Sequence, residues 1–207
     1  MGCTTPNYDY TIKKNDTKPF IKYTIESCDD IDLTEENLII TASMWADSNL
    51  KNKITTTDNY FELKNNYNLE AIKEEDYILI KKFNSSEYML VESIDETKIN
   101  IQRAQLDSNA QNWSKNNEIK IIKFYEVEAE VDIEYNTSLN VNGEEETSAS
   151  SQNLVYKWRD EDTSSPGVFF LEFKVSKIDG DQVLWTKKLP SHKEGISIKI
   201  TNDSLEA

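Results

Sequence analysis

The 207-residue sequence contains only one histidine, five glycines, four prolines and two cysteines. The single histidine, His192, lies in the turn Pro190 to Gly195, where the sequence identifies no acid or nucleophile to assist general base catalysis. No Gly-rich phosphate loop occurs, and no Cys-x-x-Cys, His-Glu-x-x-His or Gly-x-Ser-x-Gly pattern occurs either. We therefore expect no enzymatic activity, no catalytic, cofactor-binding or metal-binding residues, and no cofactor.

The two cysteines, Cys3 and Cys28, are too few for a disulfide framework. We expect both to be free thiols in a reducing compartment. Cys28 precedes Asp29 and Asp30, an acidic setting that disfavours a thiolate nucleophile. An inert residue at a strand end is the expected role of Cys28.

Basic residues are scarce, with 23 Lys and Arg against 38 Asp and Glu, and the formal net charge is −15. Phosphate binding requires clustered Lys and Arg, so a nucleic-acid partner is not expected. No window approaches 18 consecutive apolar residues, and the first ten residues, MGCTTPNYDY, lack the pattern of a secretion signal. We expect a chain that is made and kept soluble in the cytoplasm, without a membrane partner.

Alternation of apolar and polar residues is frequent, whereas no window of helical length shows an apolar stripe of period 3.6. Ile, Val, Thr and Tyr are common and favour strands. Eleven segments are predicted as strands: Phe20 to Ile25, Leu38 to Trp45, Tyr77 to Phe83, Tyr88 to Ile94, Lys98 to Ala104, Glu118 to Phe124, Glu126 to Glu134, Leu154 to Trp158, Val168 to Val175, Val183 to Trp185 and Ile196 to Ile200. The predicted fold class is all-β.

Three segments are left open to short helices, Asp47 to Lys53, Asp58 to Lys64 and Asn109 to Trp113. The segment Asn140 to Gln152 has no large apolar residue after Val141 and is rich in Ser and Glu. We interpret it as an exposed loop or arm at an edge or tip.

The clearest local pattern lies between Asn153 and Trp185. In Val168 to Val175 the residues Phe169, Leu171, Phe173 and Val175 share one face, which predicts a strand with one buried side. Pro166-Gly167 suits a tight turn before this strand, and Asp179-Gly180 is a strong hairpin signal after it. We expect Leu154 to Trp158, Val168 to Val175 and Val183 to Trp185 to form a three-stranded meander, with the turn Asp162 to Gly167 setting the register of its first pair.

The middle of the chain has four strand candidates at short spacing between Ile72 and Phe124. A closely spaced meander of this kind can curl into a small barrel. We predict a discontinuous antiparallel β-sandwich of Ig-like type, formed by residues 1–49 and 126–207, with a small β-barrel-like module, residues 50–125, inserted into it. The indoles of Trp45, Trp158 and Trp185 are expected in the sandwich core.

Acidic residues cluster at 29–32, 74–76, 144–146 and 160–162. Calcium prefers such oxygen ligands, but none of the clusters has the spacing of a known calcium loop, so solvated surfaces are the favoured interpretation. Exposed aromatic residues such as Trp113, Tyr60 and Phe61 would suit glycan recognition, although core positions explain them more simply.

Six short motifs, in the same order along the chain, resemble the N-terminal domain of phage baseplate upper proteins and related tailed-phage structural proteins. They are Lys14-Asn15-Asp16-Thr17-Lys18-Pro19, Ile31-Asp32-Leu33-Thr34, Ser43-Met44-Trp45, Val155-Tyr156-Lys157-Trp158 followed by Asp162-Thr163, Pro166-Gly167-Val168-Phe169, and Asp179-Gly180. The chain has Asn15 where the family often has Gly. Asn is the commonest substitute for Gly where φ is positive.

The middle module resembles a small β module of phage tail and virion proteins, in which an Arg-Gly step and a Gly-Thr-x-Ala turn precede the last strand. The matching segments are Glu75 to Ile80, Glu87 to Val91, Ile99 to Ala104 and Ser108 to Trp113. Here Ala104 and Asp107-Ser108 replace the glycines.

The two resemblances imply a non-enzymatic phage virion protein, a tail or baseplate adaptor that mediates assembly and anchors neighbouring proteins. Its partners would be other virion proteins and further copies of itself in a symmetric homo-oligomeric ring. It would be synthesised in the host cytoplasm and located in the virion. The alternatives are a host-receptor or glycan-binding module of the tail, a capsid decoration protein and, against the motif census, an enzyme subunit.

Overall fold

A computed structural model describes residues 10–201 except 65, 83, 140, 143 and 192–194. The described chain is nearly all β, which confirms the predicted fold class. One sheet contains β1 (Tyr10–Lys13), β3 (Leu38–Asn49), β4 (Tyr60–Glu62), β5 (Tyr77–Lys82), β6 (Ser85–Asp95), β7 (Lys98–Gln105), β8 (Glu118–Glu128), β11 (Gly167–Asp179), β12 (Gln182–Leu189) and β13 (Ile196–Thr201). A second sheet contains β2 (Ile21–Thr24), β9 (Glu130–Leu139) and β10 (Glu145–Tyr156). Each of the eleven predicted strands overlaps a strand of the structure, but the break predicted at Tyr125 is wrong, because β8 runs to Glu128 and the predicted strand Glu126 to Glu134 is divided between β8 and β9.

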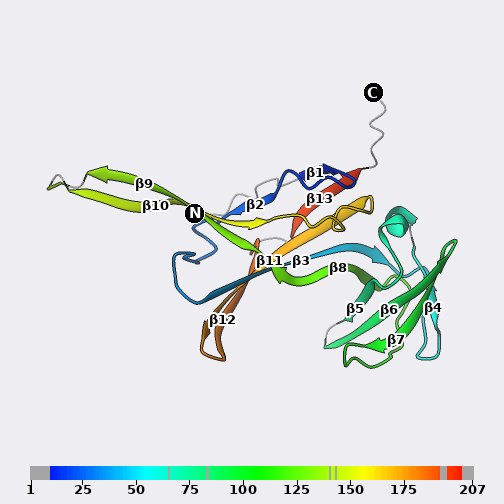
Figure 1. Cartoon of the computed structure of the whole chain (residues 1–207). Helices are drawn as coiled ribbons and strands as arrows, with labels where there is room; N and C mark the ends of the chain where they lie inside the picture. Colours follow the sequence, from blue (N-terminus) through cyan, green and yellow to red (C-terminus); the bar gives the residue numbers. More distant parts are fainter. Residues whose placement is uncertain are drawn as a thin grey trace.

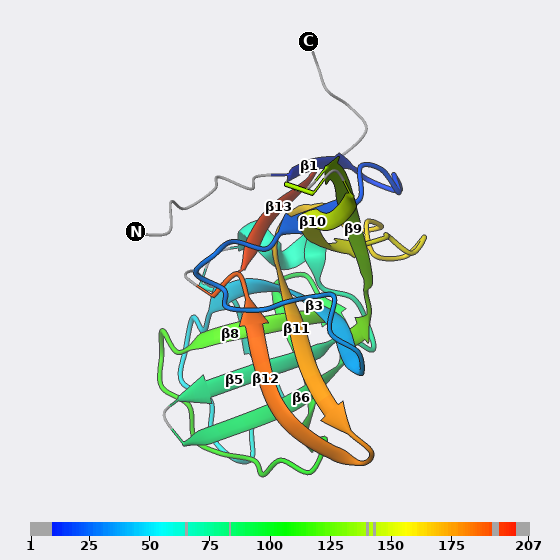
Figure 2. The same ribbon diagram turned by 90° about the vertical axis from the view of Figure 1, so that its left-hand side faces the viewer.

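The large sheet has the order β1-β13-β11-β3-β8-β5-β6-β7-β4, with β12 paired to β11, and the small sheet has the order β2-β10-β9. The large sheet bends strongly, so that β11 and β12 pass in front of β5, β6 and β8 in Figure 2. In Figure 1 the strands β4 to β7 lie at one end of the molecule, and the hairpin β9–β10 projects from the other end. Alternation of apolar and polar residues does not predict which strands lie at opposite ends of the molecule, because this arrangement depends on how the large sheet bends.

Strands β3 and β8 connect the two ends of the large sheet. They pair from Thr41 with Glu128 to Asn49 with Glu118, and β8 pairs on its other side with β5. The intervening segment therefore leaves β3 after Asn49 and returns at Glu118, while β8 continues without a break through residues 125 and 126. The division into residues 1–49 with 126–207 and an inserted 50–125 module stays a prediction.

One hydrophobic cluster extends through both ends of the sheet. On β11 the residues Phe169, Leu171, Phe173 and Val175 are fully buried, as their shared face predicts. Trp45 and Trp158 are also buried, and Trp185 is partly buried against the core.

The predicted three-stranded meander is half right. β11 and β12 form a hairpin in which Asp179 pairs with Gln182, and Gly180 at the turn has a φ of 57°. The prediction that the preceding strand pairs with β11 is wrong, because β10 belongs to the small sheet. The turn Asp162 to Gly167 therefore sets no register between them and instead carries the chain from one sheet to the other.

Buried hydrogen bonds explain this change of sheet. The Thr163 hydroxyl donates to the carbonyl of Asp16 at 2.9 Å, and the amide of Asn15 donates to the Thr163 carbonyl at 3.1 Å. Thr163 and Ser165 are buried. The polar groups of the turn are thus bonded to the segment between β1 and β2, far away in the sequence, which a local turn rule does not detect.

The three segments left open to short helices do not form them. The segment Asp47 to Lys53 begins inside β3, Asp58 to Lys64 contains β4, and Trp113 forms an isolated bridge with Ile54. A 3₁₀ helix, η1 (Asn66–Ala71), and the strands β1 and β4 were not predicted. Within the segment Asn140 to Gln152 the described residues up to Ser150 are exposed as expected, but from Glu145 onward the segment is strand β10 and not a loop.

The free thiol predicted at Cys28 is wrong, because Cys28 is disulfide-bonded. The chain's other cysteine, Cys3, lies outside the described residues. The prediction rested on the expected compartment, which says nothing about which residues the fold brings together.

Candidate interaction surfaces

The hairpin β9–β10 extends beyond the rest of the molecule as a two-stranded ribbon (Figure 1). The two strands pair from Glu130 with Val155 to Leu139 with Glu145, whereas β2 pairs with β10 only from Asn153 to Tyr156. We call residues 134–151 the arm. An isolated two-stranded ribbon is marginally stable in water, so a partner that binds the arm would stabilise it.

The base of the arm is held by side-chain hydrogen bonds. Asn153 is fully buried; its amide donates to the carbonyl of Asp132 at 3.0 Å and its oxygen accepts from the Thr24 hydroxyl at 2.8 Å. Lys22 forms ion pairs with Asp132 and Glu134 at 3.0 and 3.1 Å. These contacts fix the direction in which the arm leaves the body.

The two faces of the arm differ in polarity because side chains alternate along a strand. Tyr135 and Leu139 lie on one face with their partners Ala149 and Glu145, and Tyr135 and Leu139 are 58% and 68% exposed. The opposite face carries polar residues such as Glu134 and Glu146. Val141, in the turn at the tip, is fully exposed.

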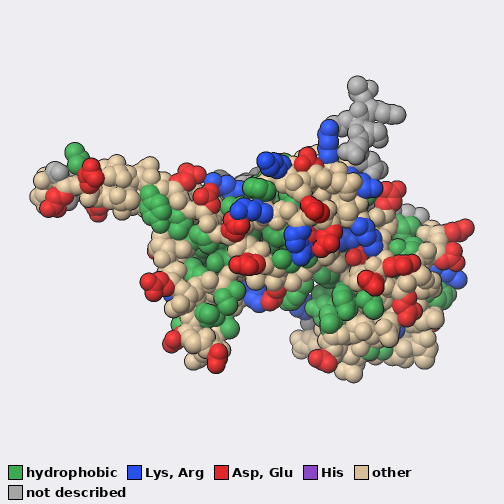
Figure 3. All heavy atoms as spheres, in the orientation of Figure 1, with side chains coloured by type: hydrophobic (Ala, Val, Ile, Leu, Met, Phe, Trp, Pro, Cys, Tyr) green, Lys and Arg blue, Asp and Glu red, His purple; other side chains and the backbone are tan. Residues whose placement is uncertain are grey.

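A second partly apolar surface lies at the other end of the molecule. Tyr77 pairs with Leu90 and Ile122, and Leu79 pairs with Tyr88 and Lys120, so these side chains lie on one side of β5, β6 and β8. With Lys81, two residues after Leu79, we call this set the outer face. Its apolar members are half-buried, while the other side of the same strands is core. Figure 3 shows hydrophobic side chains gathered over β5 and β8.

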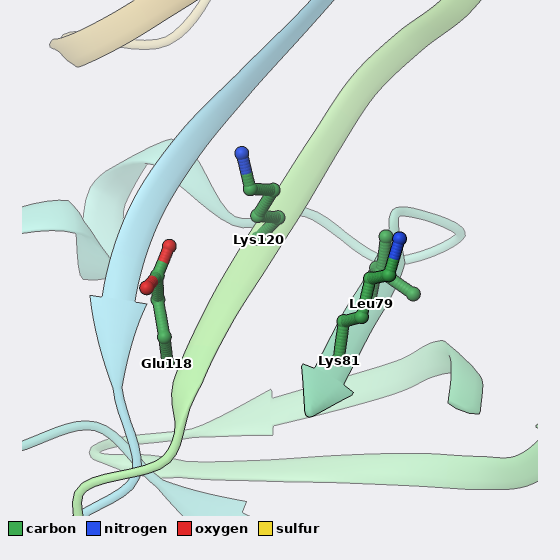
Figure 4. Close-up of a pocket in the computed structure, with 4 residues that line it drawn as sticks. All are labelled: Leu79, Lys81, Glu118 and Lys120. Carbon is green, nitrogen blue, oxygen red and sulfur yellow. The ribbon is translucent and has the colours of Figure 1, made fainter. Parts of the chain in front are cut away.

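The outer face contains a hollow of about 320 Å³ lined by Leu79, Lys81, Glu118 and Lys120 (Figure 4). The ammonium group of Lys120 lies 4.0 Å from the centre of the Trp45 ring, which stacks on Phe170 at 6.3 Å. A cation over an aromatic ring is attracted by the ring quadrupole. The ring therefore holds Lys120 in place, and among the described residues Lys120 forms no ion pair, although Glu118 lines the same hollow.

A second hollow, of about 270 Å³, lies where the turn between β10 and β11 meets the start of β5. Lys123 pairs with Asp76 at 2.6 Å, and Arg159 pairs with Asp162 at 2.9 Å. Burial lowers the pKa of Lys123, and the nearby Asp76 opposes this effect. Because these four charges are paired with one another, we assign this hollow to the contact between two parts of the fold.

Of the residues weighed for chemistry, His192 lies outside the described residues and Cys28 is disulfide-bonded. Within the part of the chain that the structure describes, no three His, Cys, Asp or Glu residues are grouped so that they could hold a metal ion.

The acidic clusters are only partly solvated surface. Asp29 and Asp162 are buried, each bonded to a tyrosine hydroxyl, so the surface interpretation is wrong for these two. Asp30 pairs with Lys187, and Glu145 and Glu146 are exposed on the arm. The glycan hypothesis also loses two of its three residues, because Trp113 and Phe61 are buried and only Tyr60 is exposed.

Sequence reasoning missed a buried ion pair in the middle of the chain. Glu87 is fully buried, and its carboxylate accepts from Arg103 Nε and Nη2 at 2.6 and 2.7 Å and from Trp113 Nε1 at 2.7 Å. Arg103 also donates to the carbonyls of Thr55 and Gln111. The only sequence signal is a charged residue at a core-facing position of an apolar strand.

The pKa of Glu87 reflects this environment. Burial alone would raise it, but hydrogen bonds from Arg103, Trp113 and Gln111 together hold the pKa below its usual range. The carboxylate therefore stays charged, and its contacts join β6 to the loops before β4 and after β7. We assign this network a structural role, which is to hold β6 and β7 to the loops beside them.

None of the described helices is long and apolar enough to span a membrane. Comparison with protein-family models finds no matching family, and comparison with curated proteins finds no match. The functional conclusion rests on the residues and surfaces described above.

Proposed function

We propose that this chain is a non-enzymatic structural component of a phage virion, a tail or baseplate adaptor that binds neighbouring virion proteins. The observation that carries the proposal is the projecting arm, with an apolar face that the chain itself leaves exposed. Exposed apolar surface of this kind marks interaction sites. The ordered resemblance to phage baseplate proteins supplies the setting.

Backbone geometry supports the resemblance at positions where the chain departs from it. Asn15, Ala104 and Asp107 stand where the related patterns have glycine, and their φ angles are 63°, 58° and 58°. Glycine adopts such left-handed conformations without steric cost, whereas other residues do so rarely. At these three positions the chain therefore keeps the left-handed backbone conformation that favours glycine, although the residue is not glycine.

The proposed mechanism is assembly through fixed surfaces. Along the described residues of β10 from Glu145 to Ser151, β9 is the only strand paired with β10, so the other edge of the ribbon is open beside the apolar face. A partner can add a strand there, cover the face, or do both. The firmly bonded base at Asn153 and Lys22 presents the arm in one direction. An adaptor needs this combination, because a defined direction fixes the geometry of its neighbours.

The test is the location of the chain in purified phage particles. Mass spectrometry of the particles and electron microscopy with an antibody against this chain are expected to detect it at the tail or baseplate. A label on the capsid would favour a decoration protein. Absence of the chain from particles whose host expresses it would overturn the proposal.

A further inference from the structure

We propose that the arm of one copy docks on the outer face of β5, β6 and β8 in a second copy, so that identical chains join head to tail. The inference rests on the proposed function, and it names both the partner and the receiving surface. The arm and the outer face lie at opposite ends of the molecule (Figure 1), so the two surfaces of one copy do not meet each other.

The two surfaces match in apolar character. The arm presents Tyr135, Leu139 and Val141, of which Val141 has no contact that shields it from solvent. The outer face presents Leu79 and Ile122 beside a hollow that is large enough for the end of a side chain. Burying the arm residues there would remove from water the largest exposed apolar side chains of the arm.

The two surfaces also match in charge. Glu145 is paired across the ribbon with Leu139 and shares its face. Lys81 and Lys120 lie beside Leu79 on the outer face, and with the single carboxylate of Glu118 in the same hollow they leave a net positive charge there. Among the described residues, Glu145, Lys81 and Lys120 form no ion pair. A copy with a net charge of −15 repels another copy, so contact requires a local site of opposite sign, and the lysines of the outer face provide one.

The contact is heterologous, because the surface that docks differs from the surface that receives. Contacts of this kind produce closed rings or open filaments, depending on the rotation between copies. Pairing of two arms with each other would instead bring the glutamates of both tips together and would produce only dimers. The two modes therefore differ in which substitutions disrupt them.

Sedimentation velocity of the full chain over a range of concentrations tests the inference. The parent is expected to form assemblies larger than a dimer as the concentration rises. One variant carries Glu145→Lys, and another combines Lys81→Glu with Lys120→Glu. We expect each alone to self-associate at least about tenfold more weakly, which corresponds to about 1.4 kcal/mol.

An equimolar mixture of the two variants is the decisive sample. The reversed arm of one faces the reversed outer face of the other, and the two unchanged surfaces also match, so the mixture is expected to assemble like the parent. Lys199→Glu, on β13, changes the net charge by two units, as Lys81→Glu alone does, and is the matched control for that single variant; it is expected to have no effect. Lys81→Glu alone, at an exposed position, replaces the double variant if Lys120→Glu lowers the melting temperature.

Three results would overturn the inference: a parent that stays monomeric, assembly insensitive to the outer-face lysines, or a mixture that fails to assemble although both variants are folded. If the parent stays monomeric but is found in purified particles, this inference fails and the proposed function stands. If the chain self-associates as described but is absent from particles, the proposed function fails instead.

Discussion

The hydroxyl of Tyr156 donates a hydrogen bond of 2.6 Å to the carboxylate of Asp162, six residues further along the chain. Tyr23 makes the same contact with Asp29, again six residues later, at 2.8 Å. In both cases the amide three residues after the tyrosine also donates to the carboxylate. The two tyrosines therefore secure the turns that follow β2 and β10, which are antiparallel neighbours in the small sheet.

Replacing Tyr156 by Phe should remove this contact without changing the shape of the core. Asp162 is buried, so the loss of one of its donors is expected to lower the free energy of unfolding by about 1 to 3 kcal/mol. Denaturant titration measures the change. Tyr135→Phe, the same substitution at an exposed position on the arm, is the control and should change stability by less than about 0.5 kcal/mol. Equal losses for the two variants would contradict the role of Tyr156.

Replacing Glu87 by Gln should break the buried pair with Arg103. Removing one partner of a buried ion pair costs about 3 to 5 kcal/mol, because the other charge remains buried without compensation. The pKa of Glu87 is lower in the folded than in the unfolded chain, so its contribution is present above the unfolded value, near 4.3. The contribution is lost as the pH falls through the lower folded pKa.

Stability curves of parent and Glu87→Gln between pH 7 and pH 2.5 should therefore converge on the acid side. The measurement is the free energy of unfolding at each pH. A difference between the two proteins that stays constant down to pH 2.5 would show that the carboxylate charge is not what matters at this site.

Gly167 precedes the core-facing residues of β11 and has a φ of 155°. A β-carbon added there would lie 3.1 Å from the ring of Phe169 and 3.3 Å from Ala71. Gly167→Val is expected to lower the free energy of unfolding by about 1 to 3 kcal/mol through backbone strain and crowding. Ser164→Ala, at a half-buried position of the same turn, removes a hydroxyl bonded to Lys73 and Glu161 but adds no backbone strain, so it should have a smaller effect. Equal melting temperatures for Gly167→Val and the parent would refute this expectation.

Ala104 offers a prediction of the opposite sign. Its φ of 58° is left-handed, which costs a residue with a β-carbon about 1 to 2 kcal/mol. Ala104→Gly removes this strain but increases the freedom of the unfolded chain, so a net gain of about 0.5 to 1 kcal/mol is expected. Thermal unfolding measures it, and a destabilised variant would show that the methyl group of Ala104 contributes more than the strain costs.

Local patterns in the sequence were sufficient to locate the strands but not their partners. Alternation is a property of each segment alone, so Phe169 and Leu171 were correctly placed in the core. The partner of β10 depends on bonds such as that of Thr163 to Asp16, between residues 147 positions apart. A hairpin rule that considers only neighbouring segments could not find it.

The candidate surfaces were less predictable than the fold. The exposure of residues 141, 142 and 144–150 followed from composition, but the apolar face of the arm depends on Tyr135 and Leu139 being left uncovered by the rest of the fold. The outer face depends on the bend that brings β5, β6 and β8 to the opposite end. Glu87 was missed because its partner Arg103 is supplied by a neighbouring strand.

The most direct test of the account is the incorporation of a chain with a shortened arm. Asn136 and Ser148 are paired across the ribbon, so an Asn-Gly turn between them replaces residues 137–147 and leaves the anchored base intact. We predict that this variant keeps the melting temperature of the parent. It should be missing from phage particles that assemble with the shortened chain as the only version of this protein. Particles that contain the shortened chain at the parent's copy number would contradict the claim that the arm holds this protein in its assembly.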